Sequence, residues 1–378
     1  MTLTALIGGR VLADSGWLDD HALLFENGRI YSLVPVSRVP AGADCVHLAG
    51  GMLLPGFIDT QVNGGGGTLF NETPTVEGIR AIGDAHRRFG TTGFLPTLIS
   101  DELEAVAMAI QAVDAAIEEK VPGVLGIHIE GPFLNSHKRG IHDASKMRQI
   151  DPEAVELLAS LKHGRTLVTL APELVPRGLI KELTQRGVIV AAGHSLATYE
   201  EMNWAYGEGL GAVTHLFNAM SQLEGRAPGV VGSALERGDI VCGIIVDGQH
   251  VHPGSLRLAY KACGADRLML VTDAMPTVGS TKKHFVLNGQ HVVATDGACR
   301  AADGTLAGSD LDMSSVLRNT ISLLNVDLRV ASRMASTTAA TLLGMGSDRG
   351  RLAPGYRADI VHLNDALTVA RTWIAGEG

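Results

Sequence analysis

Short, continuous runs of hydrophobic residues alternate with amphipathic stretches from about residue 53 to about residue 325. The runs include TGFLPT, GVLGIHIEGP, TLVTLAPE, VIVAAGHS, IVCGIIVDG and RLMLVTDAM. Parallel strands that are covered on both faces read in this way, and we expect eight of them. The intervening stretches predict helices at residues 75–89, 101–119, 152–161, 177–186, 198–208, 253–263 and about 310–325. Eight strand–helix units favour an α/β fold, a closed (β/α)8 barrel of the TIM type, over an open doubly wound sheet.

The two ends of the chain follow a different pattern. Near the N-terminus short apolar stretches alternate with turns, as in ALIGGRVL and HALLFENGRIYSLVP, which predicts small antiparallel strands. The tail RADIVHLNDALTVARTWIAGEG again reads as strands. We predict that residues 1–52 plus 350–378 form one discontinuous β-sandwich domain, which leaves residues 53–349 for the barrel. Within the barrel segment, Asn-Gly and Asp-Gly pairs predict a hairpin insertion near residues 282–308.

Composition narrows the classes of function. The chain has 378 residues and a formal net charge of -9, with no basic tract longer than Lys-Lys. This argues against nonspecific nucleic-acid binding, and an anionic substrate would need a local positive pocket. The four cysteines are far apart and lack CxxC spacing, so neither a disulfide framework nor a cysteine zinc cluster is expected. The sequence has no signal-peptide pattern and no apolar stretch of about 18 residues. We expect a cytoplasmic protein without a membrane segment.

Four residues suited to metal binding or proton transfer stand at the ends of predicted strands: Glu130, His194, His215 and Asp273. The carboxyl ends of parallel barrel strands meet at one mouth, where catalytic groups gather. Two imidazoles and a carboxylate form an open catalytic metal shell, and a further carboxylate can move a proton. The ordinary alternatives are structural histidines, a helix N-terminal carboxylate and an N-cap aspartate. Convergence at one mouth favours the metal site.

The order of motifs along nearly the whole chain resembles a known family. PGFIDTQVNGGGG is followed by HIEGPFL, AAGHS, THLFNAM and VTDAM. This combination is similar to the N-acetylglucosamine-6-phosphate deacetylases of the amidohydrolase superfamily. The resemblance implies hydrolysis of N-acetylglucosamine 6-phosphate to glucosamine 6-phosphate and acetate, in amino-sugar catabolism. It also implies that Asp273 acts as general base and then general acid, and that His142, in the RGIHD loop, polarises the amide carbonyl.

The first strand departs from the superfamily pattern. Many amidohydrolases carry His-x-His there for a second metal, whereas this chain has Gln-Val-Asn at residues 61–63. Neutral amides are poor replacements for imidazole ligands. We therefore predict one divalent metal ion, held by Glu130, His194 and His215. Zinc is the first choice, and iron, cobalt and manganese suit the same donors. Gln61 is expected to be a contact near the metal rather than a ligand.

The resemblance also implies a pocket for a sugar phosphate. Its predicted lining is Gln61, Ile141, Asn218, Ala219, Arg226, His250, Leu306, Ala307 and Gly308. Arg226 suits a phosphate because its guanidinium donates two hydrogen bonds; its other interpretation is a solvated loop residue. The family further implies a homodimer or homotetramer, in which Arg226 serves either its own subunit or a neighbour.

Two other classes of function stay open at this stage. A related amidohydrolase, acting on N-acetylgalactosamine 6-phosphate or on an N-acyl amino acid, would keep the metal site and change the pocket. A non-catalytic barrel scaffold should lack a ligand or the aspartate, and the chain has all four residues.

Overall fold

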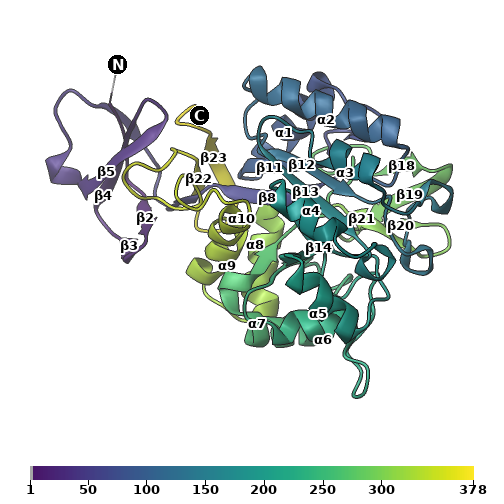
Figure 1. The fold of residues 1–378 in the computed structure, drawn as a ribbon. Helices are drawn as coiled ribbons and strands as arrows, with labels where there is room; N and C mark the ends of the chain where they lie inside the picture. Colours follow the sequence, from purple (N-terminus) through teal and green to yellow (C-terminus); the bar gives the residue numbers. More distant parts are fainter. Residues whose placement is uncertain (1–2) are drawn as a thin grey trace.

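Eight parallel strands form the centre of the computed structural model, which describes residues 3–378 (Figure 1). They are hydrogen-bonded in the order β17-β16-β15-β14-β13-β12-β11-β8. Their side chains are buried along most of each strand, as expected for strands that are covered on both faces of the sheet. The predicted (β/α)8 barrel is confirmed. The strands are β8 (Phe57–Val62), β11 (Thr91–Ile99), β12 (Gly126–Glu130), β13 (Arg165–Leu170), β14 (Ile189–Ala192), β15 (Ala212–Val213), β16 (Val241–Ile244) and β17 (Leu268–Leu270).

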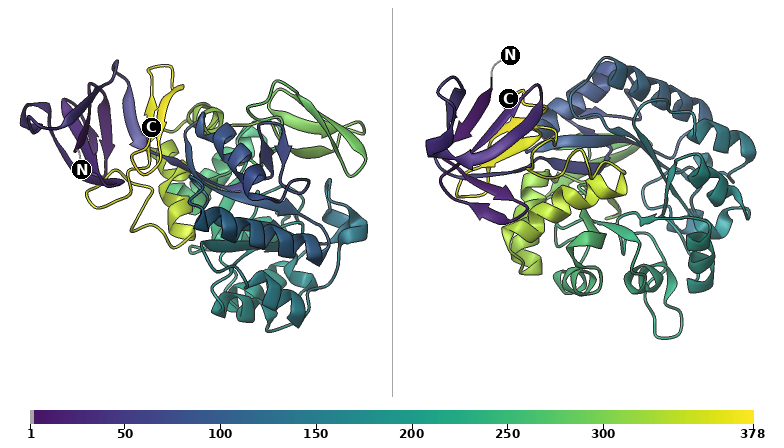
Figure 2. Two further views of the ribbon diagram at one scale, coloured as in Figure 1. Left: turned by 90° about the horizontal axis from the view of Figure 1, so that it is seen from above. Right: turned by 60° about the vertical axis from the view of Figure 1, so that its left-hand side comes forward.

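Helices surround the barrel and lie within a few residues of the predicted spans (Figure 2). Local signals set their ends; Thr198 and Glu201, for example, form a capping box at the start of α5. No helix within residues 3–378 is long and apolar enough to cross a membrane. The helices are α1 (Val76–Arg87), α2 (Leu103–Glu118), α3 (Pro152–Leu158), α4 (Leu179–Gln185), α5 (Tyr199–Gly207), α6 (Gly229–Glu236), α7 (Pro253–Arg267), α8 (Met313–Leu324), α9 (Leu328–Ala335) and α10 (Thr337–Leu342), with 3-10 turns η1 (Val36–Arg38), η2 (Ser136–Lys138), η3 (Ala144–Lys146) and η4 (Pro172–Leu174).

Strands from both chain ends form a small β domain beside the barrel (Figure 1). Its two sheets have the orders β5-β4-β1-β6 and β23-β22-β7-β2-β3, with Leu23, Leu53 and Trp373 in their shared core. The expectation of antiparallel strands is wrong for two pairs, because β1 pairs with β6 and β2 with β7 in parallel. The intervening strands supply the long connections that parallel pairing needs. The strands are β1 (Thr4–Ile7), β2 (Arg10–Ala13), β3 (Gly16–Leu18), β4 (His21–Glu26), β5 (Arg29–Pro35), β6 (Asp44–His47), β7 (Met52–Pro55), β22 (Ile360–Leu363) and β23 (Val369–Trp373).

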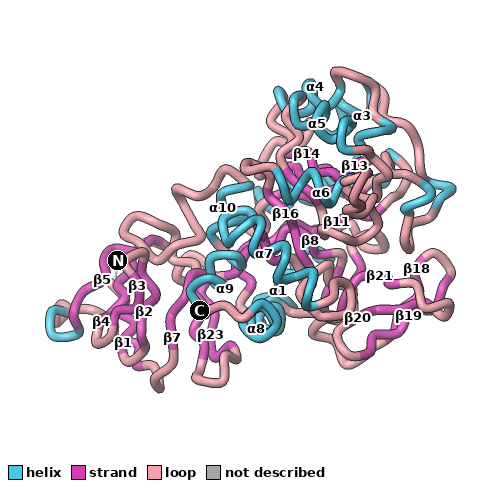
Figure 3. The backbone as a smooth tube through the Cα atoms, turned by 90° about the horizontal axis from the view of Figure 1, so that it is seen from below, coloured by secondary structure: helices cyan, strands magenta, loops and turns pink. Residues whose placement is uncertain are grey.

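A four-stranded antiparallel sheet follows the last barrel strand and lies at the opposite end of the molecule from the small domain (Figures 1 and 3). The predicted insertion was a single hairpin. Asn288 and Asp296 both have φ of 50° and begin Asn-Gly and Asp-Gly turns, and a further turn at residues 303–304 adds the fourth strand. The strands are β18 (His284–Leu287), β19 (Gln290–Thr295), β20 (Ala298–Ala301) and β21 (Leu306–Ser309); β9 (Gly64–Gly65) and β10 (Thr68–Leu69) form a separate pair.

Candidate active site

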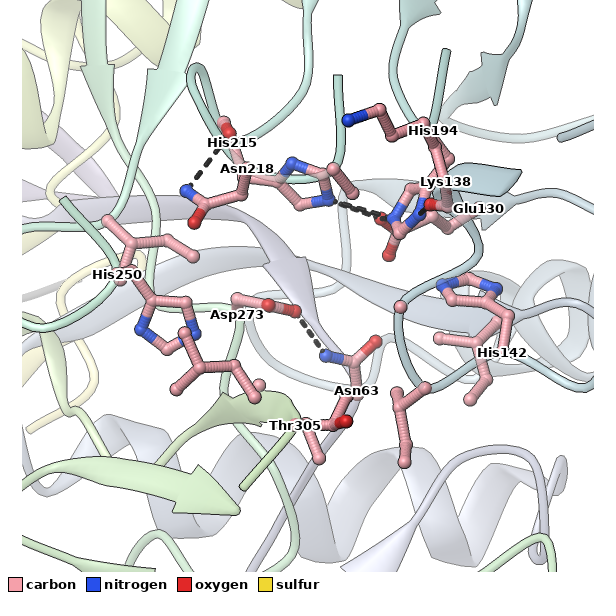
Figure 4. A pocket seen from close by; sticks show the side chains of 18 of the residues that line it. Asn63, Glu130, Lys138, His142, His194, His215, Asn218, His250, Asp273 and Thr305 are labelled. Carbon is pink, nitrogen blue, oxygen red and sulfur yellow. Dashed lines mark hydrogen bonds and ion pairs between the residues drawn. The ribbon is translucent and has the colours of Figure 1, made fainter. Parts of the chain in front are cut away.

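The carboxyl ends of four barrel strands present polar side chains to one mouth (Figure 4). Glu130 is the last residue of β12, and His194, His215 and Asp273 follow β14, β15 and β17. The last three have φ angles of 48°, 31° and 52°. Such a conformation costs a residue with a side chain roughly 1–3 kcal/mol, and it persists where the surrounding fold holds a group in place.

Glu130, His194 and His215 bring their ligand atoms together as a triangle. Glu130 Oε1 lies 3.1 Å from His194 Nε2 and 2.9 Å from His215 Nε2, and the two nitrogens are 3.0 Å apart. Tetrahedral ligands at about 2.0 Å from zinc stand about 3.3 Å from one another, so the triangle has the size of a zinc shell. All three residues are buried and can hold one metal ion. A set of three protein donors is typical of an open catalytic site.

Hydrogen bonds around the triangle determine which of its atoms carry protons. His194 Nδ1 lies 2.7 Å from the carbonyl oxygen of Lys138, so Nδ1 carries the proton and Nε2 is free to bind a metal. His215 Nδ1 is buried without a hydrogen-bond partner among the described residues. Burial opposes ionisation of Glu130, but its close contacts with the rings of His194 and His215 outweigh burial and hold the pKa of Glu130 well below its usual range. The triangle therefore favours an ionised carboxylate.

Asp273 lies beside the triangle and is held through one oxygen. Its Oδ1 accepts hydrogen bonds from Asn63 Nδ2 at 2.7 Å and from Gln61 Nε2 at 3.2 Å. The same Gln61 amide donates to Glu130 Oε2 at 3.1 Å. Burial, reinforced by the charge of Glu130, raises the pKa of Asp273 to about 6. Both bonds go to Oδ1, so Oδ2 is available to accept a proton near neutral pH.

His142 faces the triangle from the loop after β12, with its ring centroid 4.5 Å from that of His194. Its Nδ1 accepts hydrogen bonds from the Ser100 hydroxyl at 2.8 Å and from the Ser100 backbone N–H at 3.3 Å. Because a backbone N–H can only donate, the neutral ring carries its proton on Nε2. Burial lowers the pKa of His142 to about 3. Nε2–H is therefore a neutral donor next to the metal site.

A cavity of about 320 Å³ adjoins these groups (Figure 4). His250 lines it from the loop after β16, with Nδ1 2.5 Å from Asp247 Oδ2. Burial opposes ionisation of Asp247, but the bond from His250 outweighs it and lowers the pKa of this carboxyl. Asp247 thereby fixes the orientation of the His250 ring. Most of the predicted substrate contacts line this cavity: Ile141, Asn218, Ala219, His250, Leu306, Ala307 and Gly308.

Two predicted substrate contacts lie elsewhere. Gln61 is buried and outside the cavity lining, and its amide bridges Glu130 and Asp273. Arg226 is exposed. It stands at the tip of a hairpin in which Glu224 and Ala227 exchange backbone hydrogen bonds, on the segment that projects beside α6 (Figure 1). The structure does not bring Arg226 into the cavity of its own chain.

Several contacts were missed in the sequence. The sequence did not identify Asn63, which donates to Asp273, or Lys138, which lines the cavity. Asp247 follows the strand before His250, so the strand-end signal that identified Asp273 was also present there. Ser100 also directly follows a strand, β11, but its contact with His142 joins two loops that are distant in sequence, so its partner could not be read from its position.

A parallel β/α barrel whose mouth holds two histidines, a glutamate and a nearby aspartate defines the class of metal-dependent hydrolases. Comparison with known protein families agrees with this class. The model described as "Amidohydrolase family" matches residues 52–377, and the one described as "NagA composite domain" matches residues 4–53. The chain belongs to the amidohydrolase family, as its motifs had suggested.

The chain is similar to deacetylases of two phosphorylated amino sugars. It is 43% identical to the N-acetylgalactosamine-6-phosphate deacetylase of Shewanella sp. (strain ANA-3), over 98% of this chain and 94% of that protein. It is 36% identical to the N-acetylglucosamine-6-phosphate deacetylase of Homo sapiens, over 98% and 93%. The crystal structure of the N-acetylglucosamine-6-phosphate deacetylase from Pasteurella multocida matches with a TM-score of 0.96 and 34% identity, over 99% of each chain.

Proposed function

We propose that the protein is a metal-dependent deacetylase that hydrolyses N-acetylglucosamine 6-phosphate to glucosamine 6-phosphate and acetate, in amino-sugar catabolism. The observation that carries the proposal is the convergence of Glu130, His194 and His215 on one point beside Asp273. Similarity to deacetylases over nearly the whole chain supports the class of substrate.

We propose zinc as the ion held by Glu130, His194 and His215, since two imidazoles and a carboxylate are a common catalytic zinc set. Iron, cobalt and manganese are the alternatives that metal analysis would separate. When bound, the ion supplies Lewis acidity, which polarises the amide carbonyl and lowers the pKa of a water molecule. Gln61 and Asn63 occupy the strand where a second metal would need histidines, which supports one ion per chain.

Asp273 is the proton-transfer group of the proposed reaction. As a carboxylate it takes a proton from the attacking water, and it then gives that proton to the amide nitrogen as the carbon–nitrogen bond breaks. A carboxyl with a pKa raised to about 6 is suited to both steps. His142 donates from Nε2 to the carbonyl oxygen, where negative charge develops.

The cavity walls supply the proposed contacts with the sugar phosphate. His250, oriented by Asp247, and the amide of Asn218 are donors for phosphate or hydroxyl oxygens. Lys138 adds a positive charge at the cavity, which an anionic substrate of this acidic protein needs. The position of Gln61 supports a role in holding Glu130 and Asp273 over direct contact with the sugar.

N-acetylgalactosamine 6-phosphate is the second candidate substrate. The observation that favours it is the 43% identity to the Shewanella N-acetylgalactosamine-6-phosphate deacetylase, against 36% to the human N-acetylglucosamine-6-phosphate deacetylase. The two substrates differ in the configuration of one hydroxyl group. Both use the same metal site and proton-transfer group, so the choice concerns only the cavity walls.

The predicted organisation of the protein supports further proposals. The sheets built from both ends support one discontinuous β domain, predicted as residues 1–52 plus 350–378, and β7 carries its N-terminal part on to Pro55. Residues 1 and 2 lie outside the described part. A homodimer or homotetramer stays a prediction. The exposed hairpin tip that carries Arg226 supports it, since this side chain would need the cavity of a neighbour. The four free cysteines support a cytoplasmic location.

The test is acetate release by the metal-loaded protein from four compounds at equal concentration: N-acetylglucosamine 6-phosphate, its galacto epimer, unphosphorylated N-acetylglucosamine and an N-acetyl amino acid. We expect hydrolysis of a phosphorylated sugar, with the faster epimer identifying the substrate. Equal rates on N-acetylglucosamine and on its 6-phosphate would reject the phosphate pocket. Hydrolysis of none of the four compounds would reject the proposed function.

A further inference from the structure

The barrel closes at a seam between its first and last strands, β8 and β17. Neighbouring strands elsewhere in the barrel are joined by ladders, whereas this seam has one isolated bridge, between Val62 and Ala274, among the described residues. The backbone N–H groups of Asn63 and Gly64 both donate to the Ala274 carbonyl, at 2.9 and 3.0 Å. These contacts lie at the top of the seam, so other groups must join the strands below.

A buried carboxylate joins the two sides of the seam below that bridge. Asp59, within β8, has no exposed surface. It accepts hydrogen bonds from the Thr272 hydroxyl at 2.5 Å, the Thr272 N–H at 3.3 Å and the Gln61 N–H at 3.1 Å. Burial raises the pKa of Asp59 to about 7, although these bonds act in the opposite direction. A buried carboxyl costs stability unless its partners compensate, so its presence at the seam calls for a specific role.

The two segments that Asp59 joins both carry active-site groups. Thr272 immediately precedes Asp273, and Gln61 lies two positions after Asp59 on β8. Across the seam, Asp273 Oδ1 takes its hydrogen bonds from Asn63 at 2.7 Å and from Gln61 at 3.2 Å. Because successive side chains of a strand point to opposite faces, a register slip of one residue would remove both donors.

We infer that Asp59 is a positioning residue: its bonds to Thr272 and Gln61 fix the register of the β8–β17 seam and hold Asp273 against its donors. Asp59 does not line the active-site cavity, so it acts through Asp273 rather than on the substrate. The inference rests on the proposed deacetylase function. It goes beyond that function because it explains how the closure of the barrel holds the proton-transfer group in place.

The sharpest test compares Thr272→Val with Thr272→Ser in the metal-loaded enzyme. Valine keeps the shape of threonine and removes the hydroxyl, which donates to Asp59 and accepts from the Ala274 N–H at 3.2 Å. Serine keeps both of these bonds and removes only a methyl group. Misplacement of a catalytic group by about 1 Å can lower the rate about 100-fold. We expect kcat of Thr272→Val to fall roughly 10- to 100-fold, with KM within about twofold and one metal ion per chain, and kcat of Thr272→Ser to remain near wild type.

A matched control and a second pair exclude a merely structural effect. Thr320→Val removes another buried hydroxyl, which bonds to the Val316 carbonyl in α8, and should leave kcat unchanged. Asp59→Asn keeps an acceptor for the two N–H groups and should retain most activity, whereas Asp59→Ala should not; if Asp59→Ala fails to fold, the Thr272 pair decides. Wild-type kcat in Thr272→Val, or an equal loss in Thr320→Val, would overturn the inference.

A structural readout separates this inference from the proposed function. In a crystal structure of Thr272→Val, the distance from Gln61 Nε2 to Asp273 Oδ1 should exceed the 3.2 Å of the wild type. If the wild-type enzyme released no acetate, the proposed function would fail. The crystallographic distance would then decide the positioning role alone, with an unchanged distance overturning it.

Discussion

At the scale of single residues, the site is organised by where each histidine carries its proton. His194 donates a hydrogen bond from Nδ1 to the Lys138 carbonyl and presents a lone pair at Nε2, which makes it a metal ligand. His142 accepts from Ser100 at Nδ1 and presents a proton at Nε2, which makes it a donor. The same type of side chain therefore has opposite chemistry at two positions whose ring centroids are 4.5 Å apart.

Replacement of His142 tests its role as a donor. We expect His142→Ala to lower kcat roughly 10²- to 10³-fold, the usual effect of removing one such donor, with the metal content unchanged because His142 is not a ligand. Steady-state kinetics and metal analysis would measure both. His163→Ala, which removes a half-exposed surface histidine, is the matched control and should behave as wild type. Loss of metal together with activity would contradict the donor role.

Metal affinity should depend on pH through His215. Burial lowers the pKa of this histidine, but the hydrogen bond and charge of Glu130 outweigh burial and raise the pKa above 6.5. A protonated imidazole cannot bind a metal, so below this pKa each ion that binds displaces one proton. The apparent affinity for zinc should therefore rise about tenfold or more per pH unit from about pH 5 to 6.5. Titration against a competing chelator would measure it, and a flat profile would contradict this account.

The four central residues could be predicted because each stands at the end of an apolar run. Asn63 and Ser100 also directly follow strands, β8 and β11, but neither is a metal-ligand or proton-transfer type. Their importance arises from contacts with Asp273 and His142, which are distant in sequence. Arg226 shows the opposite case. Its side-chain chemistry suits a phosphate, but its exposed hairpin keeps it away from the cavity of its own chain.

At the scale of secondary-structure elements, hydrophobic patterning predicted the barrel, because buried parallel strands leave a strong signal. It did not predict the parallel pairing of β1 with β6, since pairing direction depends on the path of the chain rather than on polarity. The number of strands in the inserted sheet and its contacts with the cavity were not predicted, for a related reason. Its turns are visible in the sequence, but its bonds to the cavity loops are not: Asn288 donates to the Ile141 carbonyl, and Arg300 to Gln249.

The inserted sheet should support substrate binding through Gln249. This side chain accepts from Arg300 at 2.9 Å and donates to the Asp296 carbonyl at 2.8 Å, next to His250. Loss of one or two partly exposed hydrogen bonds is worth about 1 kcal/mol, so we expect Gln249→Ala to raise KM about 3- to 10-fold with kcat within about twofold.

Steady-state kinetics on the preferred sugar phosphate would measure this effect of Gln249→Ala. Gln185→Ala, at an exposed position of α4, is the control. An unchanged KM in Gln249→Ala would show that the sheet does not support the cavity.

At the scale of the whole molecule, the two chain ends are joined in one domain away from the barrel mouth (Figure 1). Trp373 is 2% exposed in the core of this domain. Trp373→Ala should lower the free energy of unfolding by roughly 3–5 kcal/mol and leave KM unchanged in the folded protein. Tyr31→Ala, at a residue 59% exposed in the same domain, should change it by about 0.5 kcal/mol or less. Urea unfolding would measure both, and equal losses would contradict this description of the core.

The central claim is that Glu130, His194 and His215 hold one metal ion while Asp273 moves the proton. The most direct measurement is acetate release from the preferred sugar phosphate by metal-loaded wild type and Asp273→Asn, with metal content determined on the same samples. We predict one ion per chain in both proteins and a loss of roughly 10²- to 10⁴-fold in kcat for the variant, the usual contribution of general acid–base catalysis. Full turnover by Asp273→Asn would contradict the account.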